Sequence, residues 1–468
     1  MDLTDFNELG NINLKVKEED EDFDSLADMV DEIDSEIEDS SEDCEIISYE
    51  LFEGKPLTNH ETISSRNQPK QTNVISFFLT DKDGKKLPPT FIPEPPPVNG
   101  KRKRKAESNT TKKSVTLIKR DPVSSVNKKT CPDHKRIPGT QFTVDAFSYG
   151  VIPNCKAYFL SHFHADHYMG LSKKFSSDLY CTQTTANLVL NKIRVNSINI
   201  HPLILDITHT IQGVDVVLLD ANHCPGSVIF KFTTPDGKHY IHTGDFRGHS
   251  KMESFPCLSG LYVDTLFLDT TYMNPVYTFP PQDDVINHAI TLCKNALKSD
   301  PNTLILVGSY LVGKERMYLG IAQALDCKIC VNKSKFNLLQ CYDWPELKER
   351  ITTDSRTSKL HVVKISVLSL HEIREYRDRF PSYSSVIAIR PTGWAYKKNQ
   401  ELTKIKPNKF YNILIYDLPY SEHSSYNELR RFVKFLNPQH VVPTVNTQDS
   451  RNMKTVFDMW LSGKNQLS

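Results

Sequence analysis

Short apolar runs separated by turn residues begin at about residue 131 and continue along the rest of the chain. Runs of this length, rich in β-branched and aromatic side chains, are typical of buried strands. The five clearest are KAYFL (156–160), DVVLLDA (215–221), SVIFKFT (227–233), HYIHTGDF (239–246) and TLFLDTTY (265–272). Segments 283–299 and 314–326, and SEHSSYNELRRFVKFLN from residue 421, have apolar residues three or four apart, which predicts amphipathic helices.

Residues 1–130 lack this pattern. They combine the acidic KEEDEDFDSLADMVDEIDSEIEDSSED, the proline-rich PPTFIPEPPP (88–97) and a Ser/Thr/Lys-rich stretch near 108–129. Such a composition buries too little apolar surface to offset the entropy that ordering costs. The sequence therefore predicts a disordered tail over residues 1–130.

The charges of the chain are segregated, although 57 Lys/Arg and 57 Asp/Glu cancel overall. Residues 1–50 hold 20 Asp/Glu and 2 Lys, which leaves 55 Lys/Arg against 37 Asp/Glu in residues 51–468, an excess of 18 positive charges. A basic body behind an acidic tail favours a polyanionic partner, with the tail as a solvated or regulatory arm. A surface that is charged only for solubility is the alternative.

Two short segments stand out inside the tail. Lys101, Arg102, Lys103, Arg104 and Lys105 form KRKRK, which is typical of a nuclear import signal or a nucleic-acid contact. A solvated charge run is the other interpretation of these five residues.

The second segment is QTNVISFF (71–78), in which Gln71, Val74, Phe77 and Phe78 have the spacing of a one-turn helical plug with a glutamine hook. It resembles the peptide that docks on the DNA sliding clamp, although Val74 stands where Leu, Ile or Met is more usual. Paired phenylalanines in an apolar-poor tail need a partner to bury them. We therefore expect the sliding clamp as a partner.

The ten cysteines are scattered, and the sequence has neither a secretory signal nor a run of 18 apolar residues. We expect a reducing compartment and no membrane span. The CxxC pair Cys327 and Cys330 has no second pair at zinc-finger spacing, so we interpret both as core cysteines on a strand.

Four metal-ligand side chains crowd into FLSHFHADHYMG (159–170), directly after the predicted strand KAYFL. We expect His162 and His164 on one side, sharing a metal, and Asp166 and His167 turned toward a second, with a helix beginning near Tyr168. Imidazoles and a carboxylate without thiolate suit zinc or manganese. A single motif of this kind also arises by chance or in a structural site.

Two further ligand types follow apolar runs elsewhere. His223 lies in LLDANHCPGS and Asp245 in YIHTGDFR. A carboxylate has two oxygens, so Asp245 can bridge two metals. Six ligands delivered by three strand ends predict a metal centre.

These motifs carry a family resemblance. SHFHADH, NHCPG and TGDFR, with Asp145 in FTVDAF, resemble the four motifs of the metallo-β-lactamase superfamily. Asp269 in LDTTY, His423 in SEHSSY and Val445 in VPTVN resemble its β-CASP nucleic-acid branch. IPGTQFTVDAF, VVLLDANHCPG, IHTGDFR, LDTTYMNPVYTFP and RPTGW make residues 131–460 similar to the SNM/Pso-type nucleases of DNA cross-link repair, the group of Apollo and Artemis, and most similar to the branch that digests from a 5′ end.

The resemblance implies an α/β protein with a four-layer αββα metallo-β-lactamase fold and an inserted α/β β-CASP domain. The expected divisions are a tail (1–130), a first metallo-β-lactamase part (131–274), the β-CASP domain (275–397) and a C-terminal metallo-β-lactamase part (398–468).

The resemblance also implies roles for single residues. The first metal would be held by His162, His164, His223 and Asp245, and the second, which is expected to be weakly occupied, by Asp166, His167 and Asp245. Asp145 would orient histidine ligands, and Asp166 would orient the attacking water. Asp269 and His423 would lie near the metals, with His423 acting on the phosphoryl oxygens or the leaving group. One or two Zn²⁺ ions are expected, with Mg²⁺ or Mn²⁺ possible at the second site.

The implied activity is metal-dependent 5′-to-3′ DNA exonuclease hydrolysis in interstrand cross-link repair, by a nuclear monomer acting on 5′ ends of single- and double-stranded DNA. An RNA-processing endonuclease and a structure-specific DNA endonuclease are the alternatives. Val at position 445 resembles the DNA-acting members, since RNA-processing relatives carry His there. No cysteine–histidine finger is evident in the tail.

Candidates for binding the terminal phosphate are less distinct. VGSYLVGKER (307–316) joins a predicted strand to a helix through two glycines, and with Lys314 early in the helix it suits an anion. Thr392 in RPTGW and the pair Ser424 and Ser425 are further candidates. Tyr272 and Trp394 suit either base stacking or core packing.

Overall fold

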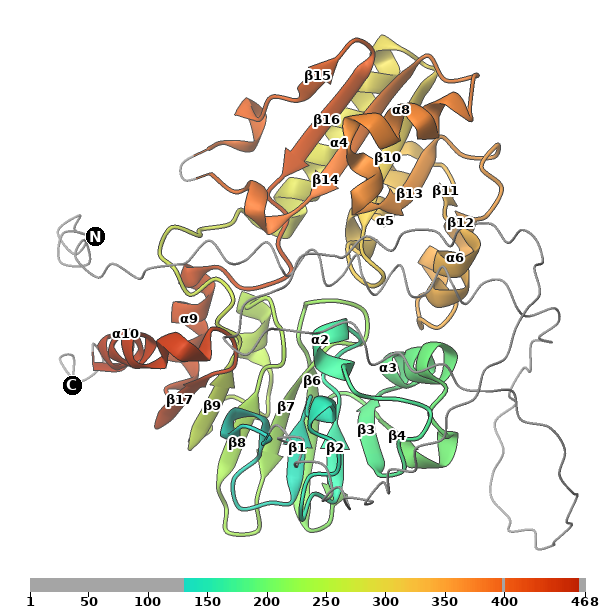
Figure 1. Ribbon diagram of the computed structural model, residues 1–468. Coiled ribbons are helices and arrows are strands. Elements are labelled where there is room, and N and C mark those ends of the chain that lie inside the picture. The colour runs from blue at the N-terminus through green and yellow to red at the C-terminus, as the bar shows by residue number, and fades with distance from the viewer. Residues whose placement is uncertain (1–129, 398–399, 463–468) are drawn as a thin grey trace, which may run out of the picture. The chain divides into compact units, whose positions relative to one another are not determined.

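The computed structural model describes residues 130–397 and 400–462, which form three sheets flanked by helices (Figure 1). The predicted tail, the clamp peptide and the basic run at 101–105 lie outside these residues. Within the described ranges no helix is long and apolar enough to cross a membrane. The cysteines of these ranges are free thiols. Cys330 is buried on a strand as expected, whereas Cys327 is half-buried and precedes that strand, so its interpretation as a core strand residue was wrong.

Two of the sheets form a sandwich. The first has the parallel order β1-β2-β3-β4, with bounds β1 (Phe142–Val144), β2 (Ala157–Phe159), β3 (Asp178–Thr182) and β4 (Ile200–Leu203). The second has the mixed order β17-β9-β8-β7-β6-β5, with bounds β17 (His440–Pro443), β9 (Thr265–Leu268), β8 (His239–His242), β7 (Val228–Thr233), β6 (Val214–Asp220) and β5 (Thr208–Ile211). All five predicted strands are present.

Period-two alternation decides which side chains enter the sandwich. Phe159 of β2 faces inward and packs against Phe232 of β7, with ring centroids 5.1 Å apart. Val216 and Leu218 of β6 join the same core. Burial of these large side chains at about 25 cal/mol per Å² holds the two sheets together.

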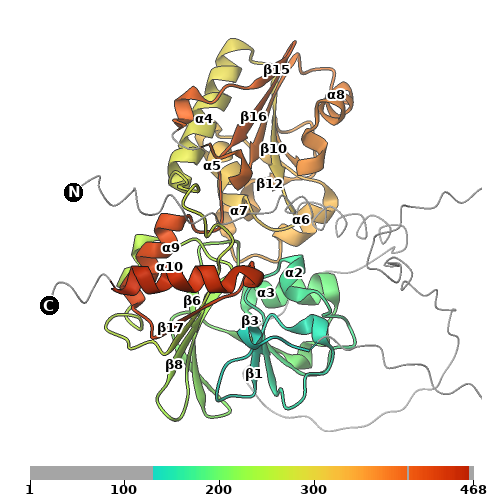
Figure 2. The same cartoon turned by 60° about the vertical axis from the view of Figure 1, so that its left-hand side comes forward.

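The outward faces of both sheets are covered by helices. The alternate residues Val217 and Leu219 of β6 pack under α9 (Tyr426–Leu436) and α10 (Ser450–Ser462), which lie next to each other (Figure 2). On the other sheet, α3 (Gln183–Leu188) packs against the outer side of β3. The predicted αββα arrangement is therefore confirmed.

The third sheet is inserted between β9 and α9. Its order is β12-β11-β13-β10-β14-β16-β15, with bounds β12 (Ile351–Thr352), β11 (Ile329–Cys330), β13 (Leu360–Lys364), β10 (Thr303–Ser309), β14 (Ser385–Pro391), β16 (Ile413–Leu418) and β15 (Asn408–Phe410). Its strands are parallel except for β15, which pairs antiparallel with β16.

Helices cover both faces of this sheet. Every residue of its central strand β10 is therefore buried. Ile305 and Val307 pack toward α4 (Gln282–Ser299) and α5 (Glu315–Leu325), and Leu304 and Leu306 pack toward α8 (Leu370–Asp378). The remaining helices are α6 (Lys333–Leu339) and α7 (Pro345–Arg350).

The structure corrects two sequence-based boundaries. Strands β15 and β16 belong to the inserted sheet, where Ile389 of β14 pairs with Tyr416. The predicted end of the inserted domain at residue 397 therefore moves to after Leu418. The helix expected to begin near Tyr168 instead ends there: α2 (Ala165–Tyr168) is a single turn inside the histidine motif.

Candidate metal centre

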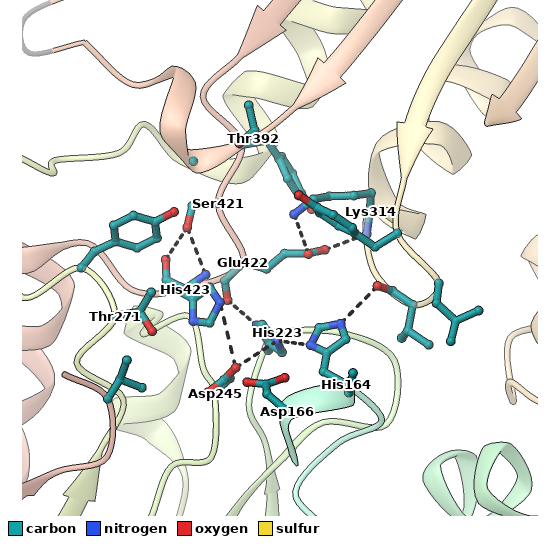
Figure 3. A pocket seen from close by; sticks show the side chains of 18 of the residues that line it. His164, Asp166, His223, Asp245, Thr271, Lys314, Thr392, Ser421, Glu422 and His423 are labelled. Atoms are coloured by element: carbon teal, nitrogen blue, oxygen red, sulfur yellow. Dashed lines mark hydrogen bonds and ion pairs between the residues drawn. The ribbon is translucent and has the colours of Figure 1, made fainter. Parts of the chain in front are cut away.

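Three histidines and an aspartate surround a common point. His162 and His164 lie between β2 and α2, while His223 follows β6 and Asp245 follows β8. Nδ1 of His164 lies 2.8 Å from Nε2 of His162. The same atom lies 3.0 Å from Nε2 of His223 (Figure 3). Oδ2 of Asp245 lies 3.7 Å and 3.8 Å from the Nε2 atoms of His162 and His223. The structure thus brings together the four residues predicted for a first metal.

The outward nitrogen of each imidazole is fixed by an oxygen. His164 donates from Nε2 to the Val312 carbonyl at 3.1 Å, and His223 donates from Nδ1 to the Glu422 carbonyl at 2.8 Å. A carbonyl can only accept, so these nitrogens carry the protons. Ser161 donates its hydroxyl proton to Asp145 at 2.7 Å, so its oxygen accepts from Nδ1 of His162 at 2.9 Å. Each ring therefore turns a lone pair toward the common point.

This donor set fits a zinc-type cation. A tetrahedral zinc with Zn–N bonds near 2.1 Å separates its ligand atoms by about 3.4 Å, and the observed separations lie on either side of that value. The lone pair of His164 lies 2.8 Å and 3.0 Å from the nitrogens that carry the other two, and such lone pairs repel unless a cation lies between them. His162, His164, His223 and Asp245 are thus the residues that would hold it.

A second group shares Asp245. Nε2 of His167 lies 3.2 Å from Oδ2 of Asp166 and 3.2 Å from Oδ2 of Asp245. Asp145 accepts from Nδ1 of His167 at 2.7 Å and reaches His162 through Ser161. The structure therefore places Asp145 where it orients histidines of both groups.

The electrostatic environment separates these histidines into two kinds. Burial lowers the pKa of His162 and of His223 well below the ordinary value, with neighbouring histidines adding to the effect. Burial also opposes charge on His167, but the carboxylates of Asp245, Asp166 and Asp145 raise its pKa well above the ordinary value. The first group thus consists of neutral imidazoles, which is the form that binds metals.

The buried Asp269 and the partly exposed His423 form a pair beside the histidines. Oδ2 of Asp269 accepts from Nδ1 of His423 at 2.9 Å, and Nε2 of His423 lies 4.0 Å from Oδ2 of Asp245. Burial opposes protonation of His423, but Asp269 and Asp245 raise its pKa to about 9. His423 is therefore a charged donor aimed at the metal group.

A pocket of about 260 Å³ opens onto this group. Its lining comes from the metallo-β-lactamase part and from the inserted domain, and it includes His164, Asp166, His223, Asp245, Thr271, Tyr272, Val312, Lys314, Thr392, Trp394, Glu422, His423 and Val445 (Figure 3). Its position beside the metal group and its mixed polar and aromatic lining suit a substrate.

The predicted phosphate contacts have different fates. Thr392 lines the pocket, whereas Ser424 and Ser425 are buried and do not. The Ser424 hydroxyl bonds to the backbone of Phe246 and Gly248, and Ser425 caps α9. We do not retain these two serines as phosphate contacts, because their hydroxyls serve the local backbone.

Lys314 differs from expectation, and the structure separates the two aromatic candidates. Lys314 precedes α5 in a left-handed conformation with φ 69° and is paired with Glu422, so it is not a free cation early in a helix. Tyr272 lines the pocket but is buried against Trp394, at a centroid distance of 5.4 Å. Trp394 is 45 % exposed, which leaves it the better candidate for stacking.

Three contributors to the site were not identified from the sequence: Ser161, the carbonyl of Val312, and Glu422. Ser161 directly precedes the histidine motif and Glu422 directly precedes His423, so adjacency to motif residues was the available signal. The Val312 carbonyl gave none, since it lies 148 positions from His164 along the chain.

Comparison with known proteins supports one family. Residues 345–449 match the family described as "DNA repair metallo-beta-lactamase". The chain is 44% identical over 368 residues to the "DNA cross-link repair protein SNM1" of Arabidopsis thaliana, covering 76% of this chain and 75% of the relative. It is 46% identical over 343 residues to the human "DNA cross-link repair 1A protein", covering 72% of this chain but 33% of that relative. It is 34% identical over 310 residues to the "5' exonuclease Apollo" of Gallus gallus, covering 66% of this chain and 63% of that relative.

The sandwich and its histidine cluster define a metallo-β-lactamase fold with an inserted β-CASP domain. The chain belongs to the DNA cross-link repair family of metallo-β-lactamase/β-CASP nucleases. The resemblance on which this family was predicted is thereby confirmed. The chain spans about a third of the length of the human relative.

Proposed function

We propose that this chain is a zinc-dependent DNA nuclease of interstrand cross-link repair that removes nucleotides in the 5′-to-3′ direction. The observation that carries the proposal is the convergence of three imidazole lone pairs and Asp245, with His164, His223 and Asp245 lining a pocket of about 260 Å³. The names of the relatives supply DNA repair and, for Apollo, the 5′ polarity.

The chemistry follows from the charges around the pocket. A bound zinc-type cation would supply charge neutralisation for the phosphodiester and would acidify a water molecule. Asp166, whose Oδ2 lies 3.2 Å from Nε2 of His167, would orient the attacking water by accepting a hydrogen bond from it. His423, held by Asp269, donates from Nε2 to a phosphoryl oxygen. One or two metals are proposed, with the group of Asp166, His167 and Asp245 as the second, weakly occupied site.

DNA is favoured over RNA by Val445. Its side chain lines the pocket, and its carbonyl accepts from the Thr270 hydroxyl at 2.6 Å, next to Asp269. The similarity to DNA-acting β-CASP members rests on this aliphatic residue. Thr392 remains a proposed contact of the terminal phosphate, and the protein is proposed to act in the nucleus as a monomer.

A digest of labelled oligonucleotides tests the proposal. Matched DNA and RNA strands, labelled at the 5′ or the 3′ end and carrying or lacking a 5′ phosphate, are incubated with and without a chelator. We expect 5′-labelled DNA to release mononucleotides at once and 3′-labelled DNA to shorten progressively, both only without chelator. Preferred RNA cleavage, internal cuts, or full activity in chelator would each overturn the assignment.

The clamp peptide is a separate part of the proposal. Replacing both Phe77 and Phe78 with Ala removes the apolar pair, so we expect the full-length protein to lose binding to the sliding clamp in a pull-down. Ser76→Ala, inside the peptide but outside the hook and plug positions, should bind as the unaltered chain does. Equal binding of the double variant would reject this partner.

A further inference from the structure

We propose that the buried ion pair between Lys314 and Glu422 positions two of the metal-binding histidines and thereby makes metal affinity depend on the inserted domain. Lys314 belongs to the loop between β10 and α5 of that domain, and Glu422 lies between β16 and α9. The inference rests on the metal centre proposed above and adds to it a positioning role for residues that bind no metal.

The two side chains are bound to each other twice. Nζ of Lys314 lies 2.7 Å from Oε2 of Glu422, and the Lys314 backbone N–H donates to Oε1 at 2.8 Å. Both side chains are 8 % exposed. The Lys314 ammonium also lies 5.4 Å from the ring centroid of Tyr420 and 5.8 Å from that of Tyr310. The loop and the 420–424 segment are therefore joined at one buried point.

Each of the joined segments holds one histidine of the centre. The loop presents the Val312 carbonyl to Nε2 of His164, and the other segment presents the Glu422 carbonyl to Nδ1 of His223. The opposite nitrogens of these two rings are those that lie 3.0 Å apart (Figure 3). A shift of either carbonyl would rotate a ring away from its partner and change its tautomer preference.

The loop is also fixed from its other side. Nζ of Lys335 donates to the carbonyls of Tyr310 and Leu311 at 2.9 Å each and lies 3.4 Å from Oε1 of Glu315. Oε1 of Glu315 accepts in turn from the Gly313 N–H at 3.1 Å. With the loop held on this side, the bond to Glu422 is what sets its distance from the metal centre.

The loop between β10 and α5 was expected to bind the phosphate of the substrate. In the structure, the carboxylate of Glu422 takes the place of that phosphate. Glu422 occupies the backbone N–H and the ammonium that an external phosphate would need. Two buried charges of this kind contribute little net stability compared with apolar residues of the same volume. A positioning role accounts for why the site holds them.

Zinc affinity measured without reference to activity tests the inference. The dissociation constant for Zn²⁺ is determined by competition with a chromogenic chelator for the full chain, Lys314→Met and Glu422→Met. We expect each single variant to bind zinc about 10–100-fold more weakly. The double variant K314M/E422M should resemble the single variants, because both remove the same connection.

Asp417→Asn is the matched control. It breaks another ion pair of the inserted domain, in which Nε of Arg390 lies 2.6 Å from Oδ1 of Asp417, and it touches neither histidine. We expect unchanged zinc affinity for this variant. If a single variant fails to fold, as judged by thermal unfolding in chelator, K314M/E422M carries the test because it leaves no unpaired buried charge.

The outcomes separate the two proposals. Absence of tight zinc binding by the unaltered chain would reject the metal centre itself. Tight binding by the unaltered chain with equal binding by folded Glu422→Met, Lys314→Met or the double variant would overturn the positioning role alone.

Discussion

Replacing Asp245 with Asn should leave the protein without bound zinc and lower its nuclease activity by about three orders of magnitude or more. Oδ2 of Asp245 is the atom shared by the two groups, 3.2 Å from Nε2 of His167 and 3.7 Å from Nε2 of His162. It supplies the negative charge that three neutral imidazoles lack. Asn has the same shape but no charge, so the variant isolates the electrostatic contribution.

The measurement for Asp245→Asn is zinc content after dialysis, together with kcat/KM on 5′-phosphorylated single-stranded DNA. Thermal unfolding adds a third readout, because zinc that binds only the folded chain stabilises it by about 2.7 kcal/mol at a hundredfold excess over Kd. We expect this stabilisation to vanish. Asp220→Asn is the control, since Asp220 is the last residue of β6 in the same sheet but is exposed and accepts from the Asn222 N–H. Full zinc content with activity within tenfold would contradict the assignment of Asp245.

The strand ends of the site were predictable because local patterns encode them. Short apolar runs place His162, His223 and Asp245 after β2, β6 and β8, strands of the two sheets of the sandwich, and the ends of these strands meet at one edge of it. The single-turn helix α2 was misplaced because one turn is too short to show helical periodicity. The donor types indicated zinc or manganese without knowledge of the fold.

The parts that were not predictable depend on distant segments. The Glu422 carbonyl accepts from His223, which lies 199 positions away along the chain. The Glu422 carboxylate binds the loop between β10 and α5, which the sequence indicated as a phosphate site. A pattern that suits an anion cannot state whether that anion belongs to the protein or to the substrate. The predicted end of the inserted domain was wrong for a similar reason. The polar stretch after Trp394 resembles a domain end, although β16 follows it and belongs to the same sheet.

The Asp269 carboxylate is surrounded by donors. Oδ1 accepts from the Thr271 N–H at 3.0 Å and from its hydroxyl at 2.6 Å. Oδ2 accepts from the Phe246 N–H at 3.2 Å and from Nδ1 of His423 at 2.9 Å. Because a backbone N–H faces each oxygen, an amide NH₂ group at either position would meet a donor. The site therefore requires a carboxylate in order to orient His423.

Asp269→Asn should accordingly lower kcat about 100- to 1000-fold while the zinc content stays unchanged, because His423 loses its orientation but the metal ligands remain. Asp264→Asn is the control for losing a hydrogen bond from a backbone N–H to a carboxylate. Asp264 accepts such a bond from the His239 N–H, at the end of β8 away from the site. In a His423→Ala background, Asp269→Asn should cost less than tenfold further, because the pair acts as a unit. If the loss of kcat in the double variant equals the product of the losses in the two single variants, Asp269 acts on the reaction without His423. The two residues would then need separate roles.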